Sequence, residues 1–135
     1  MKIKDLLKDG ADFLGGKKTS LLDCEVVLAH VLDVDREYLF RNSEQEVEAD
    51  FLPVFKDAIA RVKNGEPVAY LIKSKEFFGL DFYVDNRVLV PRPETELLVE
   101  RILEFFDRED RVYSMIDVGT GSGNIAISVA KSLLD

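Results

Sequence analysis

The sequence is poor in the side chains from which metal sites, disulfides and catalytic dyads are usually built. Its 135 residues include one cysteine, one histidine and no tryptophan. A single cysteine excludes an internal disulfide, and a reducing compartment fits this composition. Cys24 lies within an apolar helical pattern, so we expect a buried thiol rather than a nucleophile. His30 lies six residues later without metal-ligand spacing or a triad, so we expect an ordinary helix residue and no bound metal.

Long hydrophobic runs and an excess of positive charge are also missing. No run of 18 apolar residues occurs, and the first ten residues lack the apolar core of a signal peptide. We therefore expect a protein that is neither secreted nor membrane-spanning, with a cytoplasmic location. The formal net charge of −8 argues against a nucleic-acid-binding platform, which usually has a basic face. A basic protein partner is compatible with this charge.

Apolar residues recur at helical spacing through the first half of the sequence. The pattern predicts helices over residues 3–14, 20–32, 35–40 and 44–63. Asp35 is the expected N-cap of the third helix, and Pro53 lies in the first turn of the fourth or kinks it. Asn64 and Gly65 are typical of a helix C-terminus. We therefore predict a helical N-terminal domain over residues 1–65.

The periodicity changes after Gly65. Short strands are predicted over residues 68–72, 76–84, 88–90 and 112–118, with a turn near 78–79 or 85–86. Helices are predicted over 94–106 and 123–134, with a charged loop at 107–110. These elements indicate a β-rich connector over residues 66–91 and the opening α-β-α part of an α/β domain over residues 92–135.

A glycine-rich turn joins the last predicted strand to the last predicted helix. Asp117 lies near the end of the strand, and Gly119, Gly121 and Gly123 follow at alternate positions. Such a turn exposes backbone N–H groups and lets a ligand approach the main chain. The spacing is not that of a phosphate-binding P-loop, and Asn124 stands where a dinucleotide fingerprint would have its third glycine. From these residues alone, a methyl-donor site, a dinucleotide site and a purely structural turn remain open.

Four sequence motifs in a fixed order carry a family resemblance. They are GEPVAYL at 65–71, EFFGLDF at 76–82, VPRPETELLVE at 90–100 and DVGTGSGN at 117–124. Together they resemble the HemK/PrmC family, methyltransferases that modify a glutamine side-chain amide in peptide chain release factors. The resemblance covers essentially the whole chain. It implies a class I, Rossmann-like methyltransferase fold after the helical bundle and the β-hairpin connector, truncated in this sequence.

The resemblance also implies a cofactor, a partner and a set of site residues. The cofactor is S-adenosylmethionine, and the partner is a release factor whose Gly-Gly-Gln motif carries the substrate glutamine. The helical domain would help to engage that factor. The expected cofactor-binding residues are Asp117, Gly119, Thr120, Gly121, Ser122 and Gly123. The segment Pro91, Arg92, Pro93, Glu94 and Thr95 would border the pocket, with ion pairing by Arg92 and Glu94 and a helix cap from Thr95. A rigid connector without ligand contact is the alternative for this segment.

The Asn-Pro-Pro-Tyr motif of the family does not occur in these 135 residues. In the family this motif orients the amide nitrogen, which is a poor nucleophile because its lone pair is delocalised. Since such alignment contributes roughly 7–11 kcal/mol, we assign no catalytic residue and expect the chain alone to be inactive. We also expect it to bind the cofactor weakly or not at all. The uncovered strand at 112–118 is expected to pair either with the connector hairpin or with another molecule. A non-catalytic adaptor and a dinucleotide-dependent enzyme are the competing interpretations.

Overall fold

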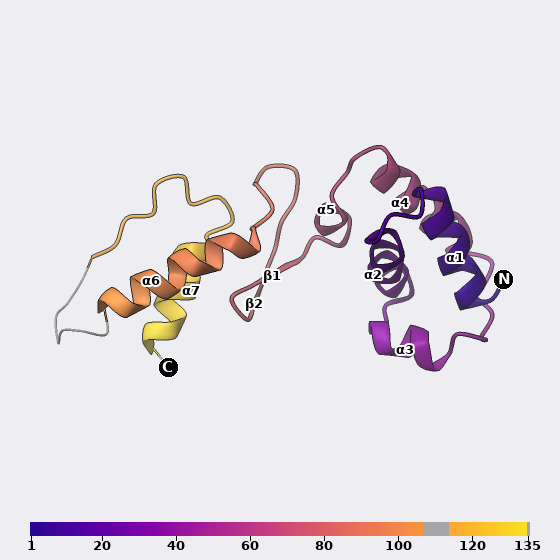
Figure 1. The fold of residues 1–135 in the computed structure, drawn as a ribbon, viewed down its shortest axis with the longest axis horizontal. Helices are drawn as coiled ribbons and strands as arrows, with labels where there is room; N and C mark the ends of the chain where they lie inside the picture. The colour runs from indigo at the N-terminus through magenta and orange to yellow at the C-terminus, as the bar shows by residue number, and fades with distance from the viewer. Residues whose placement is uncertain (107–113, 135) are drawn as a thin grey trace. The chain divides into compact units, whose positions relative to one another are not determined.

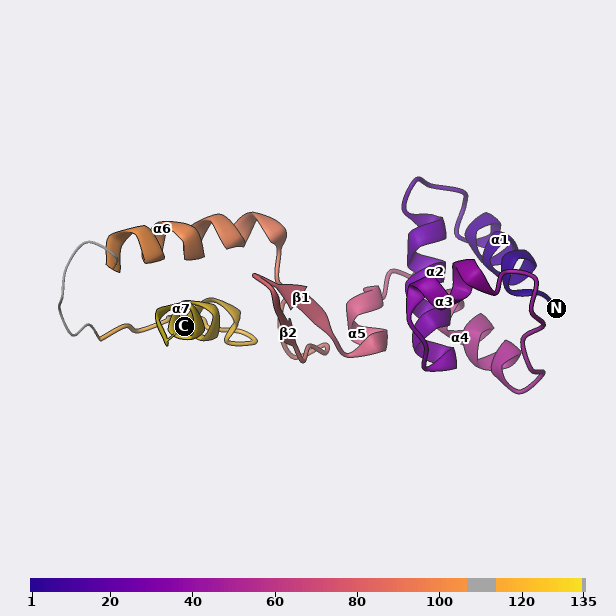
Figure 2. The same cartoon turned by 90° about the horizontal axis from the view of Figure 1, so that it is seen from below.

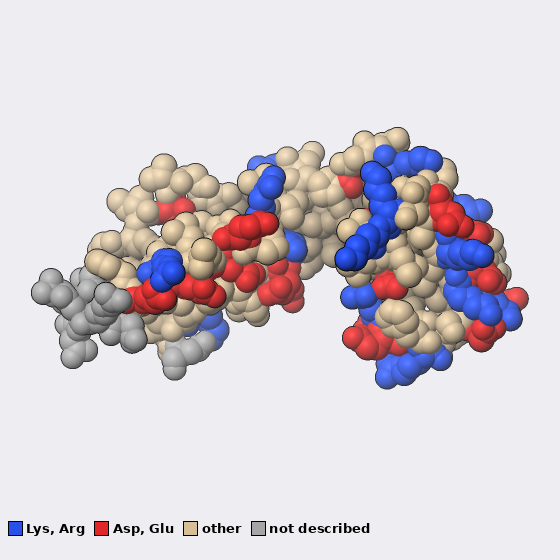
Figure 3. Space-filling view, in the orientation of Figure 1, with Lys and Arg blue, Asp and Glu red and all other residues tan. Residues whose placement is uncertain are grey.

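The computed structural model describes residues 1–106 and 114–134 (Figures 1 and 2). The chain divides into two compact units, Met1–Ile72 and Lys73–Asp135. Among the described residues, no helix combines the length and the hydrophobicity needed to cross a bilayer. On the face drawn in Figure 3, acidic side chains gather over part of the second unit, whereas basic and acidic side chains alternate over the first.

The first unit is helical. Its helices are α1 (Ile3–Phe13), α2 (Ser20–Leu32), α3 (Arg36–Arg41), α4 (Phe51–Lys63) and α5 (Val68–Ile72). The first four confirm the helices predicted from periodicity. The side chain of Asp35 accepts a hydrogen bond of 2.6 Å from the Tyr38 N–H, as expected for an N-cap. Pro53 lies in the first turn of α4, where its missing N–H breaks no helical hydrogen bond.

Two predictions for this unit are wrong. Residues 44–50 are not helical, and residues 43–47 pair with the N-terminus instead. The Ile3 N–H donates to the Gln45 carbonyl at 3.0 Å, and the Val47 N–H donates to the Met1 carbonyl at 2.9 Å. The predicted strand at 68–72 is the short helix α5. A brief apolar run has no period long enough to distinguish a strand from a buried helical turn.

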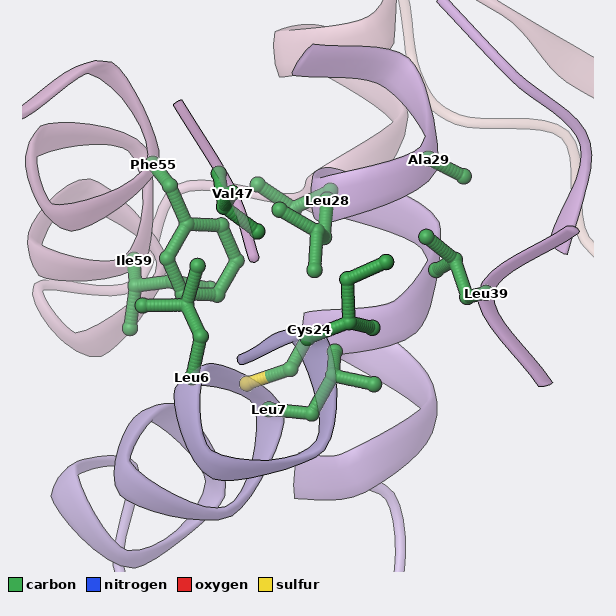
Figure 4. Close-up of a cluster of buried hydrophobic side chains, with 11 residues drawn as sticks. Leu6, Leu7, Cys24, Leu28, Ala29, Leu39, Val47, Phe55 and Ile59 are labelled. Carbon is green, nitrogen blue, oxygen red and sulfur yellow. The ribbon is translucent and has the colours of Figure 1, made fainter. Parts of the chain in front are cut away.

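The core of the first unit forms where α1, α2 and α4 meet (Figure 4). Phe55 and Ile59 of α4 lie against Leu6 of α1 and Cys24 of α2. Gly10 is required for this close approach, since an added Cβ would lie 2.9 Å from the Cys24 Sγ atom. The Cys24 side chain is fully buried, and its burial raises the pKa of the thiol to about 11. The predicted buried thiol is therefore confirmed.

A partly buried ion pair joins two helices beside this core. Arg36 of α3 donates to the Glu25 carboxylate of α2 at 2.6 Å. Glu25 is buried, so its charge needs this partner, and the pair fixes the turn between the two helices. His30 is an exposed residue in the last turn of α2, as predicted.

The second unit begins with a β-hairpin. Strands β1 (Lys75–Phe77) and β2 (Leu80–Phe82) are antiparallel, with Phe77 opposite Leu80. The tight turn at residues 78–79 confirms one of the two predicted turn positions. A short 3₁₀ helix η1 (Pro93–Thr95) leads into α6 (Glu96–Phe106), and α7 (Asn124–Leu134) lies beside α6 (Figure 2). Their shared core contains Phe77, Phe82, Val99 and Val129.

The other strands predicted in this unit are not formed. Residues 88–90 follow a turn in which the Val88 N–H donates to the Asp85 carbonyl at 3.1 Å. Residues 114–117 form no strand, because no neighbouring strand in the described part of the chain pairs with them. The predicted loop at 107–110 and the first residues of the 112–118 strand lie outside the described residues. The sheet expected to open an α/β domain therefore stays a prediction.

Candidate functional site

The glycine turn adopts a backbone conformation that other residues avoid. The φ angles of Gly119, Gly121 and Gly123 are 78°, 58° and 80°, all in the left-handed region. Placing an ordinary L-residue there costs about 1–2 kcal/mol at each position. An added Cβ at Gly119 would meet no atom within 4 Å, so the requirement at this position is conformational and the space beside it is open. The turn thus presents bare backbone to solvent.

Hydrogen bonds join the turn to helix α7. The Gly123 N–H donates to the Thr120 carbonyl at 2.9 Å, and the Ile127 N–H donates to the Gly123 carbonyl at 2.9 Å. The Ser122 hydroxyl donates to the Asn124 side-chain oxygen at 3.1 Å. Asn124 is buried at the start of the helix. The turn is therefore continuous with the N-terminus of α7, where N–H groups are available to a ligand.

Asp117 is the acid that the sequence places before the turn. It is half-buried and accepts a hydrogen bond of 3.0 Å from the Thr120 hydroxyl. Its carboxylate forms no salt bridge with any residue that the structure describes. The structure thus brings Asp117 and Thr120 together, as the predicted site requires, and leaves the acid able to accept further hydrogen bonds.

A cavity of about 440 Å³ lies beside Asp117. Helix α6 contributes Leu98 and Ile102 to its lining, α7 contributes Ile125, and the extended segment contributes Ile116. The lining is mostly apolar, and Asp117 is its only acidic member among the described residues. Arg101 is the basic member of the lining, and part of the apolar wall is surface that the rest of a larger domain would cover. The polar end of the cavity at Asp117 is the part that suits a small-molecule site.

The segment at 91–95 has the extended entry that its prolines predict. Arg92 has φ −97° and ψ 138°, and Pro91 is buried. Arg92 and Glu94 are both exposed and form no ion pair with residues in the described ranges, so the expected ion pairing stays a prediction. Thr95 lies inside η1, which continues directly into α6, so it does not occupy a cap position. None of these residues lines the cavity beside Asp117, and their role at the pocket border stays a prediction.

Sequence reasoning missed one polar contact near this segment. Phe78 in the hairpin turn has φ 52°, which is rare for a bulky residue. Its N–H donates to the Glu96 carboxylate at 3.0 Å, and the Gly79 N–H donates to the Glu76 carboxylate at 2.7 Å. A hydrogen bond to a charged group contributes about 1.5–3 kcal/mol, enough to offset the strain at Phe78. A Phe-Gly turn gives no sequence signal for this conformation, since Asn-Gly is the usual one.

The residues of the turn fit a small cationic ligand better than a metal ion. No cluster of three or more histidine, cysteine or acidic side chains that could hold a metal occurs among the residues with assigned positions. The available carboxylate beside the open space at Gly119 suits an ammonium group, and the helix N–H groups can donate to hydrogen-bond acceptors elsewhere on the same ligand. S-adenosylmethionine has an ammonium group of this kind, so the donor set present is compatible with it.

Comparison with known proteins adds a family relationship. Residues 5–72 match the model of the PrmC N-terminal domain. A release factor glutamine methyltransferase from Koribacter versatilis is 48% identical over 110 residues, which cover 82% of this chain and 39% of that protein. The corresponding protein of Clostridium acetobutylicum is 40% identical over 139 residues, covering 100% of this chain and 48% of its own length.

The same pattern holds for a third relative. The release factor glutamine methyltransferase of Buchnera aphidicola subsp. Baizongia pistaciae is 40% identical over 138 residues, covering 100% of this chain and 49% of that protein. The chain thus spans about half the length, or less, of these curated relatives. The matches that cover the whole chain include both the helical unit and the glycine turn.

Proposed function

The chain belongs to the HemK/PrmC family, and we propose that it acts as part of a release factor glutamine methyltransferase. The reaction is transfer of a methyl group from S-adenosylmethionine to the side-chain amide nitrogen of the glutamine in a Gly-Gly-Gln motif. The observation that carries this proposal is the half-buried Asp117 two residues before the first of three left-handed glycines, within a region matched by relatives of that name. The proposal assigns to this chain the activity that those relatives are named for.

Within this proposal, the residues of the glycine turn hold the cofactor. The Asp117 carboxylate accepts hydrogen bonds from the ammonium group of the ligand. Gly119 and Gly121 let the ligand approach the main chain, and Thr120 and Ser122 add hydroxyl groups, with Gly123 leading into α7. The bound cofactor supplies a methyl group activated by its attachment to a sulfonium. Residues 91–95, which do not line the cavity beside Asp117, would border the cofactor from the N-terminal side of α6.

We propose that three segments of the chain have different roles. Residues 1–65 form the helical domain that engages the release factor, residues 66–91 form the connector, and residues 92–135 open the Rossmann-like domain. Support for the last part comes from the exposed apolar side chains of Ile116 and Val118, which are 88% and 91% exposed. A central strand of a methyltransferase sheet would bury such residues. The group that aligns the amide nitrogen lies outside this chain, so residues 1–135 alone are inactive.

The test is a methyl-transfer assay with the full-length enzyme that contains this sequence. A release factor accepts the methyl group, and the same factor with alanine in place of the Gly-Gly-Gln glutamine does not. Equal labelling of both factors would disprove the proposed substrate. Residues 1–135 alone serve as the negative control and transfer no methyl group.

Asp117 provides a sharper test of the cofactor site. Asp117→Asn raises the Kd for S-adenosylmethionine roughly ten- to hundredfold, because a hydrogen bond to a charged group contributes about 1.5–3 kcal/mol. Calorimetry on the full-length enzyme measures this change. Asp81→Asn, which removes an exposed acid from β2, is the matched control and leaves the Kd unchanged. An unaltered Kd in Asp117→Asn would remove Asp117 from the site.

A further inference from the structure

The hairpin turn holds two neighbouring N–H groups that need acceptors. Phe78 and Gly79 both have positive φ angles, 52° and 73°, and lie between the paired residues Phe77 and Leu80. Two carboxylates accept from these N–H groups. Glu76 comes from the preceding strand, whereas Glu96 comes from the first residue of α6, 18 positions further along the chain. The second contact therefore joins the hairpin to a distant helix.

The Phe78 contact fixes the start of α6. Glu96 is half-buried, and its hydrogen bond to the Phe78 N–H is partly shielded from water. Three residues later, Val99 is fully buried in the core formed with Phe77 and Phe82 of the hairpin. Residues three apart lie on the same face of a helix, so this face of α6 is held against the hairpin by one polar and one apolar contact.

Other positions of α6 line the cavity beside Asp117. Leu98 and Ile102 are spaced four residues apart and contribute to its wall. On the N-terminal side, Glu96 directly follows Thr95, the last residue of the 91–95 segment. The rotation of α6 about its axis thus decides both where Leu98 and Ile102 lie and where the 91–95 segment ends.

We propose that Glu96 is a positioning residue for the cofactor site. By accepting the Phe78 N–H, it locks the rotation of α6, and with it the cavity wall beside Asp117 and the path of residues 91–95. This inference rests on the proposed function, because it takes the cavity and the glycine turn to form the site for S-adenosylmethionine. Glu96 itself does not touch the cofactor in this scheme. Its effect on cofactor affinity is exerted through Leu98, Ile102 and the 91–95 segment.

Three substitutions of Glu96 separate the effect of side-chain length from the effect of charge. Glu96→Gln keeps an oxygen at the same distance and loses the charge, whereas Glu96→Asp keeps the charge and is too short to reach the Phe78 N–H. Glu96→Ala loses both. In the full-length enzyme, we expect the Asp and Ala variants to raise the Kd for S-adenosylmethionine about tenfold, and the Gln variant to stay within about threefold of wild type. Glu100→Ala, which removes an exposed acid one turn further along α6, leaves the Kd unchanged.

Amide hydrogen exchange gives a readout that does not depend on catalysis. Exchange at Phe78 speeds up about tenfold in the Asp and Ala variants, while exchange at Gly79, whose acceptor is Glu76, keeps its wild-type rate. Glu76→Ala gives the reverse pattern. If Glu96→Ala fails to fold, the comparison of the Asp and Gln variants carries the same information.

The outcomes distinguish this inference from the proposed function. Faster exchange at Phe78 with an unchanged Kd would show a purely structural contact and overturn the positioning role. A Gln variant as impaired as Ala, beside an unimpaired Asp variant, would show that the charge matters and would also overturn it. A wild-type enzyme that binds S-adenosylmethionine without methylating a release factor would disprove the proposed substrate while the Kd series still tests Glu96. A wild-type enzyme that does not bind the cofactor would overturn both.

Discussion

The two units of the chain differ in how they bury their apolar side chains. In the first, one cluster gathers eleven buried residues from α1, α2, α3, α4 and the segment that pairs with the N-terminus. In the second, the cluster contains four buried residues among those that the structure describes, while Phe105, Ile116 and Val118 are 67%, 88% and 91% exposed. The first unit therefore has a core of its own. The second has apolar surface that a larger domain would cover, which agrees with relatives about twice as long as this chain.

The largest difference in stability between the two units is expected when one phenylalanine in each unit is replaced by alanine. Phe55 is 1% exposed in the first unit, whereas Phe105 is 67% exposed in the second. Phe55→Ala lowers the free energy of unfolding of the chain by about 3–5 kcal/mol, because it leaves a cavity in a packed core. Phe105→Ala changes it by less than about 0.5 kcal/mol. Chemical denaturation measures both, and equal losses would show that the two units do not differ as described.

A smaller effect is expected from the close approach of helices in the first unit. Gly10→Ala would improve helix propensity, but the added Cβ would lie 2.9 Å from the Cys24 Sγ atom and 3.2 Å from the Phe55 ring. We expect a net loss of about 1–3 kcal/mol in the free energy of unfolding, as in other overpacked cores.

A double-mutant cycle checks the cause of this loss. Combining Gly10→Ala with Cys24→Ala removes the nearest atom, so the double variant is more stable than the sum of the two single effects implies. Strict additivity would mean that the sulfur is not the obstacle. The same cycle would also show how much of the core's tightness depends on Cys24.

The buried thiol of Cys24 should make the stability of the first unit fall at alkaline pH. Burial raises the pKa of Cys24 from 9.0 to about 11, so the folded state keeps its proton where the unfolded state has lost it. This stabilising contribution is complete below pH 9 and is lost as the pH rises towards 11, by about 1–2 kcal/mol. Denaturation at pH 8 and pH 10.5 measures the loss. Cys24→Ala should abolish the part of the pH dependence that comes from the thiol, and an unchanged slope would assign it to other groups.

The smallest effect on stability is expected in the second unit. Replacing Ile116 and Val118 by threonine removes exposed apolar surface without disturbing a core, so the free energy of unfolding changes by less than about 0.5 kcal/mol. Self-association of residues 1–135 should nevertheless fall, because the uncovered extended segment is where chains would pair. Sedimentation at several concentrations measures this. A wild-type chain that stays monomeric would disprove the expected self-association.

Local patterns in the sequence were sufficient for much of the fold. Helical spacing predicted α1 to α4, α6 and α7, and the cap at Asp35 and the hairpin turn at 78–79 were also correct. These features depend on residues close in sequence. The glycine turn belongs to the same class, since alternating glycines signal positive φ angles whatever surrounds them.

The features that sequence reasoning missed depend on distant partners. Residues 43–47 pair with the N-terminus instead of continuing a helix, and the Glu96 carboxylate accepts the Phe78 N–H across 18 positions. No local pattern signals either contact. Residues 114–117 show the opposite case: the local pattern is that of a strand, but no strand forms because no neighbouring strand among the described residues pairs with them.

The pairing of the N-terminus with residues 43–47 also bears on the order of folding. The Ile3 and Lys4 N–H groups, at the start of α1, find their acceptors in the carbonyls of Gln45 and Ser43. This contact closes a loop of roughly forty residues, and the entropy of closure must be overcome before the contact stabilises anything. During synthesis, α1 and α2 therefore leave the ribosome before the segment that secures the first turn of α1. The first turn of α1 is secured only when it meets a segment made some forty residues later.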